Sequence, residues 1–453
     1  MDAIRTLADQ VVSTKRSDLP EPAIEAVKTF VLDSFGVANA GSRGPWVKSL
    51  IETASLSGQG TAARVWNSGT LLPAPAVAMC NAYQLHNSEF DCIHEAAVVH
   101  PMAVVLPAAM AVAERMGGVD GGAMMTAVAL GVDVATRIGV ASNAPLRFFR
   151  PATAGAMGAT AAIGKLMGFD ADSLVNAFAT AYAQLAGNMQ AHTEGSMLLA
   201  IQIGFSARNA VVACDMAAAG INGPKDLLQG PFGYYALYEG DYDAEILLAD
   251  LGTRWQITEV GHKPFPSGRA THGIIDAMLS AKQNDGIGPD DIAMISAAVP
   301  PLTHGLVGRP SHDAMNVNYA RLCAPFAAAC ALLRGTVDLE DFTDTSLKDP
   351  ARLALAERIA VFADDNPDDN ALTPIEVTTE LTDGRRLVQT ITDVYGSPAK
   401  PMSHDAHLAK FRQNWRWGRT PLPESAGEAL IAMVDDLDAV ADMRQLVDTM
   451  VPA

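Results

Sequence analysis

Three histidines and three acids fall within one fifteen-residue segment, although the 453-residue chain has only ten histidines. They are His86, Glu89, Asp91, His94, Glu95 and His100. A carboxylate beside an imidazole sets the pKa and the tautomer of that imidazole, and proton transfer near neutral pH needs such control. Because very apolar helices are expected on both sides, this polar cluster predicts an acid/base site. The alternative is a polar loop whose acids cap the helix after Pro101.

A second candidate site is the loop 261–272, which two prolines stiffen. Lys263 and Arg269 carry fixed positive charge, and an arginine can hold a carboxylate through two parallel hydrogen bonds. Ser267 leads into an expected helix start that also carries His272, where free N–H groups and the helix dipole favour an anion. The loop therefore predicts a carboxylate-binding site. An ordinary capped helix with solvated charges is the alternative.

Two shorter polar segments interrupt the apolar helices. The turn 192–196 (HTEGS) either lines the same pocket, with Ser196 facing the substrate, or is a plain connection. Arg147 and Arg150 flank two phenylalanines and either bind carboxylates or pair with surface acids. His404 and His407 lie in a proline-flanked connection, and we expect them to be structural.

The motifs that mark metal and cofactor sites are absent from the sequence. His94-Glu95 begins like a zinc-protease HExxH motif, but Val98 stands where the second histidine belongs. Asp91, His94 and Glu95 would share one helical face and hold a metal, although local capping and pairing is the favoured interpretation. There is no GxGxxG loop, no Walker A loop and no GxSxG elbow. We therefore predict a metal-free site, and dinucleotide use, phosphoryl transfer and serine-hydrolase chemistry lose support.

The first half of the chain is dominated by Ala, Met, Leu and Val at helical spacing. Many of these segments are apolar on most faces, which is typical of helices at the centre of a bundle. Expected helices begin near Pro22 and then cover 75–86, 104–116, 123–139, 154–167, 171–187, 199–219 and, more weakly, 243–251.

The pattern changes near Gln256. Residues 292–299 form a strand-like run, and two alternating segments, 375–381 and 387–391, flank an Asp-Gly hairpin turn. Helical segments are expected at 269–281 and 319–334, and again at 424–450. The predicted fold is mainly α with an inserted α+β domain: a large all-helical domain from 1–260 and 398–453, and a smaller α+β domain from 261–397.

The net charge of −19 and the pI of about 4.8 oppose binding to nucleic acid or to an anionic membrane. A site for an anion must therefore be a local positive pocket. Five scattered cysteines without a CxxC pair favour reduced thiols and a cytoplasmic location. The first residues lack the apolar region of a secretion signal. Apolar stretches such as 102–113 and 197–205 are too short to span a bilayer.

Several short motifs follow one another in an order that resembles the MmgE/PrpD family, which includes 2-methylcitrate dehydratase, cis-aconitate decarboxylase and iminodisuccinate epimerase. They are 32–38 (LDSFGVA), Glu89-Phe90-Asp91 with His100-Pro101, 106–109 (LPAA) with Ala113-Glu114, 131–134 (GVDV) with Arg137-Ile138, Glu194-Gly195-Ser196, 263–267 (KPFPS) with His272, and Lys410-Phe411. The resemblance implies a helical domain built from both chain ends plus an inserted α+β domain. It also implies a homodimer, a site between the domains and no cofactor.

The family's functional residues carry over unevenly. The acid of its DFDD segment falls on Glu89 or Asp91, its HP histidine on His100, and the lysine of its KPYPS-like segment on Lys263. Three positions depart from the pattern: a threonine is Ile93 here, a histidine of the dehydratases and the decarboxylase is Phe149, and a lysine after the EGS turn is Leu199. The loss of an imidazole and an ammonium changes which proton transfers are possible.

We interpret the chain as a cofactor-independent enzyme that abstracts a proton next to a carboxylate of a small di- or tricarboxylic acid. The missing groups favour an epimerase or isomerase, or an unassigned lyase. The alternatives are a 2-methylcitrate dehydratase-like hydro-lyase, a cis-aconitate decarboxylase-like lyase, and a family member that binds carboxylates without catalysis.

Each candidate residue has a predicted role. Lys263, Arg269 and Arg150 hold the substrate carboxylates. His100, with Asp91 nearby, is base or acid, and His94 or His272 takes the opposite role. The full catalytic set is Asp91, His94, His100, Lys263 and His272, and the substrate-binding set is Glu89, Arg150, Ser196, Ser267 and Arg269.

Overall fold

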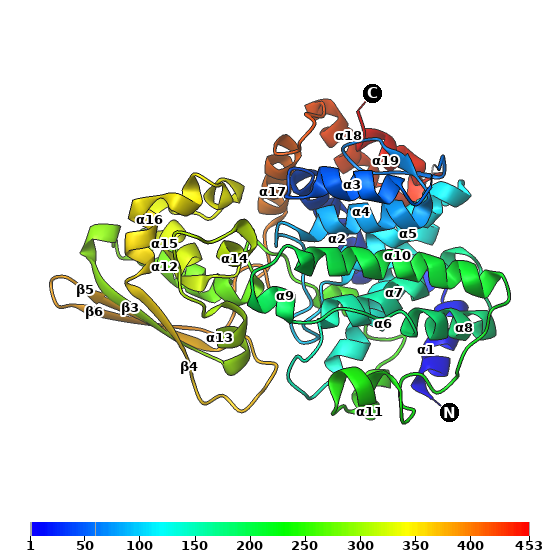
Figure 1. Cartoon of the computed structure of the whole chain (residues 1–453), viewed down its shortest axis with the longest axis horizontal. Coiled ribbons are helices and arrows are strands. Elements are labelled where there is room, and N and C mark those ends of the chain that lie inside the picture. The colour runs from blue at the N-terminus through cyan, green and yellow to red at the C-terminus, as the bar shows by residue number, and fades with distance from the viewer. Residues whose placement is uncertain (1, 59, 453) are drawn as a thin grey trace.

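The computed structural model describes residues 2–58 and 60–452, and it has two parts (Figure 1). A large helical domain contains both ends of the chain. A smaller domain combines helices with a four-stranded sheet, drawn in yellow-green to orange. This is the predicted fold class, a mainly α chain with an inserted α+β domain.

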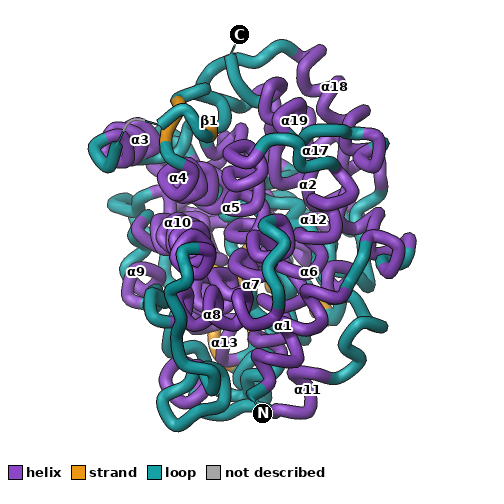
Figure 2. Tube along the Cα trace, turned by 90° about the vertical axis from the view of Figure 1, so that its right-hand side faces the viewer, coloured by secondary structure: helices purple, strands orange, loops and turns teal. Residues whose placement is uncertain are grey.

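The helical domain is built around helices that are buried on almost every face. Figure 2 shows α5, α6 and α7 in the middle of the packed helices. Gly131 of α6 and Gly158 of α7 allow a close approach, since a Cβ on Gly158 would lie 2.3 Å from the Gly131 carbonyl oxygen. The helices from the first part of the chain are α1 (Ala3–Ser13), α2 (Glu21–Gly41), α3 (Val47–Ser55), α4 (Ala74–His86), α5 (Pro101–Met116), α6 (Gly121–Val140), α7 (Arg150–Leu166), α8 (Ala171–Tyr182), α9 (Gln190–Thr193), α10 (Leu198–Ala218) and α11 (Ala244–Leu248). A two-stranded ribbon joins β1 (Ala63–Arg64) to β2 (Leu71–Leu72).

Helix α6 is long and apolar enough to cross a membrane by length and composition. Its apolar window is 89% buried inside the protein, as is typical of a core helix.

The end of the chain returns to the first helices, as the adjoining blue and red ribbons in Figure 1 show. The returning elements are α17 (His404–Arg416), α18 (Glu424–Asp435) and α19 (Arg444–Thr449). Helix α17 packs against α2, where the buried Asn39 side chain donates to the Trp415 carbonyl oxygen at 2.7 Å. His404 and His407 therefore begin a helix rather than lying in a connection.

The α+β domain has strands in the order β4-β3-β5-β6, with β3 and β4 parallel and the other pairs antiparallel. The strands are β3 (Ile292–Val299), β4 (Ile359–Ala363), β5 (Ile375–Leu381) and β6 (Arg386–Ile391). The predicted hairpin is confirmed, and Gly384 in its turn has φ +88°. Strand β4 was not expected from the sequence.

Helices cover this sheet and enclose a second hydrophobic core. They are α12 (His272–Asn284), α13 (Pro301–Val307), α14 (Val317–Arg321), α15 (Ala324–Arg334) and α16 (Pro350–Ala356). The single helix expected at 319–334 is broken between α14 and α15, because Pro325 occupies the first turn of a new helix.

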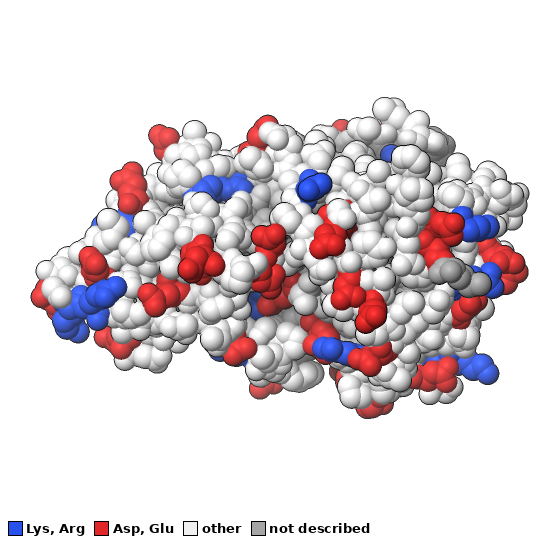
Figure 3. All heavy atoms as spheres, turned by 90° about the horizontal axis from the view of Figure 1, so that it is seen from below, with Lys and Arg blue, Asp and Glu red and all other residues white. Residues whose placement is uncertain are grey.

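Polar contacts cross the junction between the domains. Arg321 donates to the Asn87 carbonyl oxygen at 2.7 Å, and Asn318 donates to the Ser196 carbonyl oxygen at 2.9 Å. On the face shown in Figure 3, acidic side chains outnumber basic ones, in keeping with the net charge of −19. An anion site must therefore be recessed among local cations.

Candidate active site

The two segments singled out in the sequence meet at the domain junction. Ile93 and Gly261 form an antiparallel bridge, with backbone N–H to oxygen distances of 3.0 and 2.8 Å. This bridge places the histidine-rich loop beside the loop that carries Lys263. The side chains of the two loops consequently share one buried polar cluster.

Asp91 is the centre of this cluster. Its carboxylate lies 3.0 Å from Nδ1 of His86, 3.1 Å from Nδ1 of His100 and 3.9 Å from Nζ of Lys263. The Lys263 ammonium donates to Glu89 at 2.8 Å. Asp91 and Lys263 are completely buried, so these charges interact with little screening.

The neighbouring cations keep both carboxylates ionised. Burial raises the pKa of Glu89, but the charges of Lys263 and the two imidazoles outweigh it and lower that pKa to about 2. Burial also opposes the charge on Asp91, yet His86, His100 and Lys263 together hold its pKa well below the ordinary value.

The two imidazoles that share Asp91 have pKa values shifted in opposite directions. For His86, burial favours the neutral ring, but Asp91 and Glu89 outweigh it and raise the pKa. For His100, burial and the Lys263 charge lower the pKa despite Asp91. Nδ1 of His86 bonds the Asp91 carboxylate, and Nδ1 of His100 bonds the Cys92 carbonyl oxygen at 3.1 Å, with Asp91 at the same distance. These partners are acceptors, so both rings carry a proton on Nδ1. The pair therefore offers one acid and one base at similar pH.

A small cavity of about 60 Å³ borders this cluster. Pockets that hold whole ligands span about 300–1,000 Å³, so we expect substrate access to require movement of the cavity walls. Nε2 of His86 is buried and has no hydrogen-bond partner among the described residues. The lining polar residues are His86, Glu89, His100, His192 and Arg269, and the apolar lining includes Ile93, Val98, Phe149, Leu199, Leu306 and Leu322.

The loop beside the cavity holds two non-glycine residues in the left-handed region. Glu89 has φ +51° and Val98 has φ +50°. A β-branched residue rarely adopts this conformation, and each such position costs about 1–3 kcal/mol. The surrounding packing must therefore hold this loop in place. One restraint is Lys410, whose ammonium donates to the Phe90 carbonyl oxygen at 3.0 Å.

Four of the ten predicted site residues, Glu89, Asp91, His100 and Lys263, form this cluster. Arg269 also borders the cavity, but its guanidinium turns away to Glu95 at 2.6 Å and to the carbonyl oxygen of Tyr395 at 2.8 Å.

The two histidines predicted to oppose His100 do not border the cavity. Nε2 of His94 bonds Gln256 at 3.0 Å on the far side of the loop, and burial lowers the pKa of His94 to about 4. The His272 ring is buried, with Nε2 3.2 Å from the Ser267 carbonyl oxygen. His86 is the imidazole that faces His100 instead, at 4.9 Å between ring centroids.

Three predicted substrate-binding residues are occupied by structural contacts. Ser267 is buried with its hydroxyl 2.8 Å from that of Thr271, and the Ser196 hydroxyl accepts from the Leu198 N–H. Arg150 is buried, and its N–H groups already donate to Glu239, Ser142 Oγ, Asn370 Oδ1 and the carbonyl oxygens of Ala97 and Ala144. These partners leave Arg150 no donor for a substrate.

The sequence placed two cavity residues, His86 and His192, in candidate segments without a predicted role, and it did not single out one cation near them. His86 ends α4 five residues before Asp91, and this spacing was the available signal. His192 lay in a turn for which a plain connection was an equal alternative. Arg309, in a loop after α13, bonds His192 at 3.2 Å and had no local signal at all.

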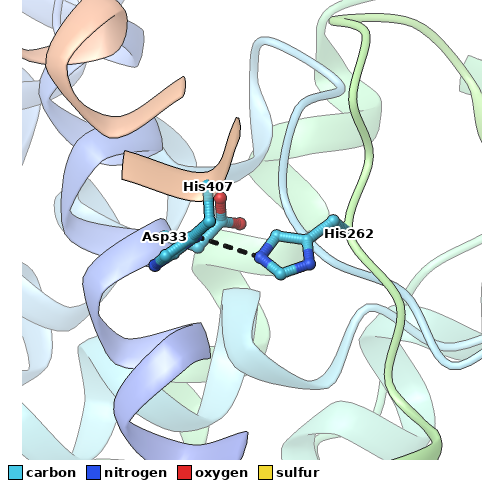
Figure 4. Close-up of side chains that lie close together, drawn as sticks. All are labelled: Asp33, His262 and His407. Atoms are coloured by element: carbon cyan, nitrogen blue, oxygen red, sulfur yellow. Dashed lines mark hydrogen bonds between the residues drawn. The ribbon is translucent and has the colours of Figure 1, made fainter. Parts of the chain in front are cut away.

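A second buried histidine cluster lies beside the first. Asp33 of α2, His262 and His407 of α17 offer ligand atoms within 4.8 Å of one another (Figure 4). The Asp33 charge is already matched by the Lys410 ammonium at 2.7 Å. A divalent cation added there would leave two uncompensated positive charges in a buried site, so these residues fit a metal poorly.

The three positions that depart from the family pattern, Ile93, Phe149 and Leu199, all line the cavity. An apolar wall therefore stands where the resemblance places a hydroxyl, an imidazole and an ammonium. The polar groups that remain are those around Asp91 and Glu89, together with His192.

Comparison with known proteins matches nearly the whole chain. Residues 5–247 match the MmgE/PrpD N-terminal domain, and residues 265–439 match the MmgE/PrpD C-terminal domain. Cis-aconitate decarboxylase from Mus musculus is 26% identical, over 96% of this chain and 91% of the relative. The Homo sapiens enzyme is 25% identical over 96% and 92%, and that of Aspergillus terreus is 25% identical over 95% and 92%.

Proposed function

Because the chain belongs to the MmgE/PrpD family, we propose that it is a lyase acting on a small di- or tricarboxylic acid by acid/base chemistry. The observation that carries the proposal is the buried pair of imidazoles beside Asp91, both of which border a cavity at the domain junction. The matched relatives are cis-aconitate decarboxylases, which favours loss of CO2 over the epimerisation expected from the sequence.

In this proposal His100 is the base and His86 is the acid. His100 has the lowered pKa and is neutral near pH 7, so its Nε2 can accept a proton from carbon. His86 has the raised pKa, and its Nε2–H, which makes no hydrogen bond and lies 3.7 Å from the Glu89 carboxylate, can donate a proton. Asp91 orients both rings, and Lys263 with Glu89 fixes the local charge.

Decarboxylation of an unsaturated tricarboxylate such as cis-aconitate uses the acid. The bond from carbon to the leaving carboxylate breaks, its electron pair shifts through the double bond, and the far carbon takes a proton from His86. CO2 leaves, and His86 regains its proton from solvent. A carboxylate becomes neutral in this step, so the apolar side chains of Phe149 and Leu199 favour it over the charged ground state.

Epimerisation is the second candidate, and the presence of both an acid and a base supports it. His100 would remove the proton next to a carboxylate, and another group would return it on the opposite face. The His86 and His100 rings are 4.9 Å apart and share one carboxylate, so both approach the substrate from one side. This arrangement favours the lyase.

The test is incubation of the protein in D2O with a panel of di- and tricarboxylates that includes cis-aconitate, followed by NMR and by CO2 detection. We expect deuterium in the product together with CO2 release. Deuterated starting material without CO2 would point to epimerisation. No deuterium in any compound would refute the proposed enzyme and favour a carboxylate-binding protein.

A matched pair of variants links the reaction to the cluster. His86→Ala should reduce turnover by about 100-fold or more, because a positioned acid contributes about 10²–10⁴-fold. His304→Ala removes a histidine outside the described cavity lining and should leave turnover within twofold. Equal turnover in the two variants would contradict the assignment of His86.

A further inference from the structure

One cavity-lining imidazole belongs to neither buried cluster. His192 of α9 is buried on the helical side of the domain junction. Arg309, from the α+β domain, approaches it with a guanidinium nitrogen 3.2 Å from Nδ1. The contact therefore joins the two domains at the cavity wall.

The chemistry of arginine determines the proton position on His192. A guanidinium has only N–H donors and stays charged in proteins. Nδ1 of His192 must therefore accept, which leaves the ring neutral with its proton on Nε2. Burial and the Arg309 charge agree with this assignment, since together they lower the pKa of His192 to about 4.

The surroundings of Arg309 hold it in this orientation. Its guanidinium lies 5.0 Å from the centroid of the Tyr319 ring, and the nitrogen that reaches His192 also donates to the Leu306 carbonyl oxygen at 3.3 Å. The Tyr319 hydroxyl in turn donates to the Pro310 carbonyl oxygen at 2.8 Å. Nη1 of Arg309 is buried and has no hydrogen-bond partner within the described part of the chain.

The turn before α10 brings His192 to this place. Gly195 has φ +66°, and a Cβ there would lie 2.7 Å from the Tyr319 side chain. Glycine therefore allows both the left-handed turn and the close contact with the α+β domain. Leu199, in the first turn of α10, lines the same cavity, so the cavity wall has a neutral imidazole and no ammonium from this position.

We propose that the Nε2–H of His192, held in this tautomer by Arg309, donates to a carboxylate oxygen of the substrate as negative charge moves during the reaction. The inference rests on the proposed function and adds a substrate-contacting residue to it. His192 is then a catalytic residue, and Arg309 is a positioning residue that acts through it. A neutral donor stabilises charge as it develops without binding the ground state as strongly as an ammonium.

The first test is the tautomer itself, read from the ring 15N shifts of His192 by NMR. We expect a neutral ring protonated on Nε2 from pH 8 down to about pH 5, and a change in its Nε2 shift when the unreactive tricarboxylate tricarballylate is added. A ring protonated on Nδ1 would overturn the inference. In Arg309→Met the pKa of His192 should rise and the single tautomer should be lost, whereas the control Arg385→Met, on the exposed hairpin, should change neither.

The second test is kinetic, with cis-aconitate or whichever panel compound the wild-type protein converts. His192→Phe keeps the ring shape without the donor and should lower kcat by about 100-fold, as loss of one oxyanion donor does. His192→Asn restores an N–H and should recover at least tenfold of that loss. Full activity of a folded His192→Phe variant would overturn this inference alone. If wild-type protein converts no compound, the proposed function fails first and this inference fails with it.

Discussion

Two buried clusters in this protein have almost the same composition. One contains Asp91, His86, His100 and Lys263, and the other contains Asp33, His262, His407 and Lys410. Each has a carboxylate, two imidazoles and an ammonium within a few ångströms. The first borders the cavity at the domain junction, which the second does not line, and in the second Nε2 of His262 bonds Nδ1 of His407 at 3.1 Å (Figure 4).

The two clusters differ in the pKa values of their imidazoles, and the group beside each ring explains why. In the first cluster Nδ1 of both rings lies within 3.1 Å of the Asp91 carboxylate, and their pKa values move apart. In the second cluster the rings bond each other, and a hydrogen bond between neutral imidazoles needs no charge on either. Burial lowers the pKa of His262 to about 3 and also lowers that of His407. The second cluster therefore has no acid for neutral pH, and residue type alone does not identify a catalytic site.

The second cluster supports the first. Lys410 contacts the backbone of Phe90, which lies between Glu89 and Asp91, and His262 is the neighbour of Lys263. The two strained loop positions, Glu89 and Val98, are on the same loop. We therefore expect substitutions in the first cluster to change chemistry and those in the second to change stability.

The largest expected effect is on turnover. Asp91→Asn removes the charge that orients His86 and His100 and should lower kcat by about 10³-fold, within the range of acid/base catalysis. Asp33→Asn is the matched change in the second cluster and should alter kcat per folded molecule by less than about fivefold. Steady-state kinetics at equal folded concentration checks both. Similar losses in the two variants would remove the distinction.

The next effect is on stability. Lys410→Met leaves the buried Asp33 carboxylate without its partner and should lower the free energy of unfolding by about 3–5 kcal/mol. Urea unfolding measures it. The double variant Asp33→Asn/Lys410→Met removes the unpaired charge and should recover at least half of the loss. A double variant no more stable than the single one would show that the ion pair is not the cause.

A smaller effect concerns pH. Decarboxylation needs protonated His86, whose raised pKa places the alkaline limb of the profile above pH 6.5. Epimerisation would also need neutral His100, whose lowered pKa would place an acid limb below pH 6.5. Decarboxylation should therefore slow about tenfold per pH unit beyond the alkaline limb. In Glu89→Gln one charge that raises the pKa of His86 is lost, so the alkaline limb should move to lower pH. A kcat/KM profile without an alkaline limb would contradict the assignment of His86 as the acid.

The smallest expected effect is that of metal removal. If neither cluster holds a functional cation, dialysis against EDTA should change kcat by less than twofold, and added Zn²⁺ should not increase it. An activity that EDTA abolishes and Zn²⁺ restores would show that one of the clusters is a metal site after all.

Local patterns in the sequence predicted much of the fold. Helical spacing of small apolar residues located the central helices to within a few residues, and the Asp383-Gly384 turn identified a hairpin. Helix periodicity and hairpin turns depend on residues that are close together in the chain, so a local sequence pattern is enough to predict them. Strand β4 was missed, because it depends on pairing with β3 more than sixty residues earlier.

The residues of the candidate site also fall into two groups: those that local sequence identified, and those whose surroundings only the fold determined. Residue types and order identified Glu89, Asp91, His100 and Lys263, since charged groups that stand between apolar helices need buried partners. The predicted roles of Arg150, His94 and His272 did not match the positions of their side chains. Contacts with residues far away in the chain set those positions, as Glu239 does for Arg150 and Gln256 for His94.

By itself the sequence determined the helical and α+β character, the family and the two segments that meet at the candidate site, because local spacing and residue type encode these properties. The tertiary structure alone decided that His86 rather than His94 faces His100, that Arg309 reaches His192 from the other domain, and which of two similar clusters borders the cavity at the domain junction. The pKa of an imidazole depends on burial and on charges within a few ångströms, and only the packing of distant segments sets those distances.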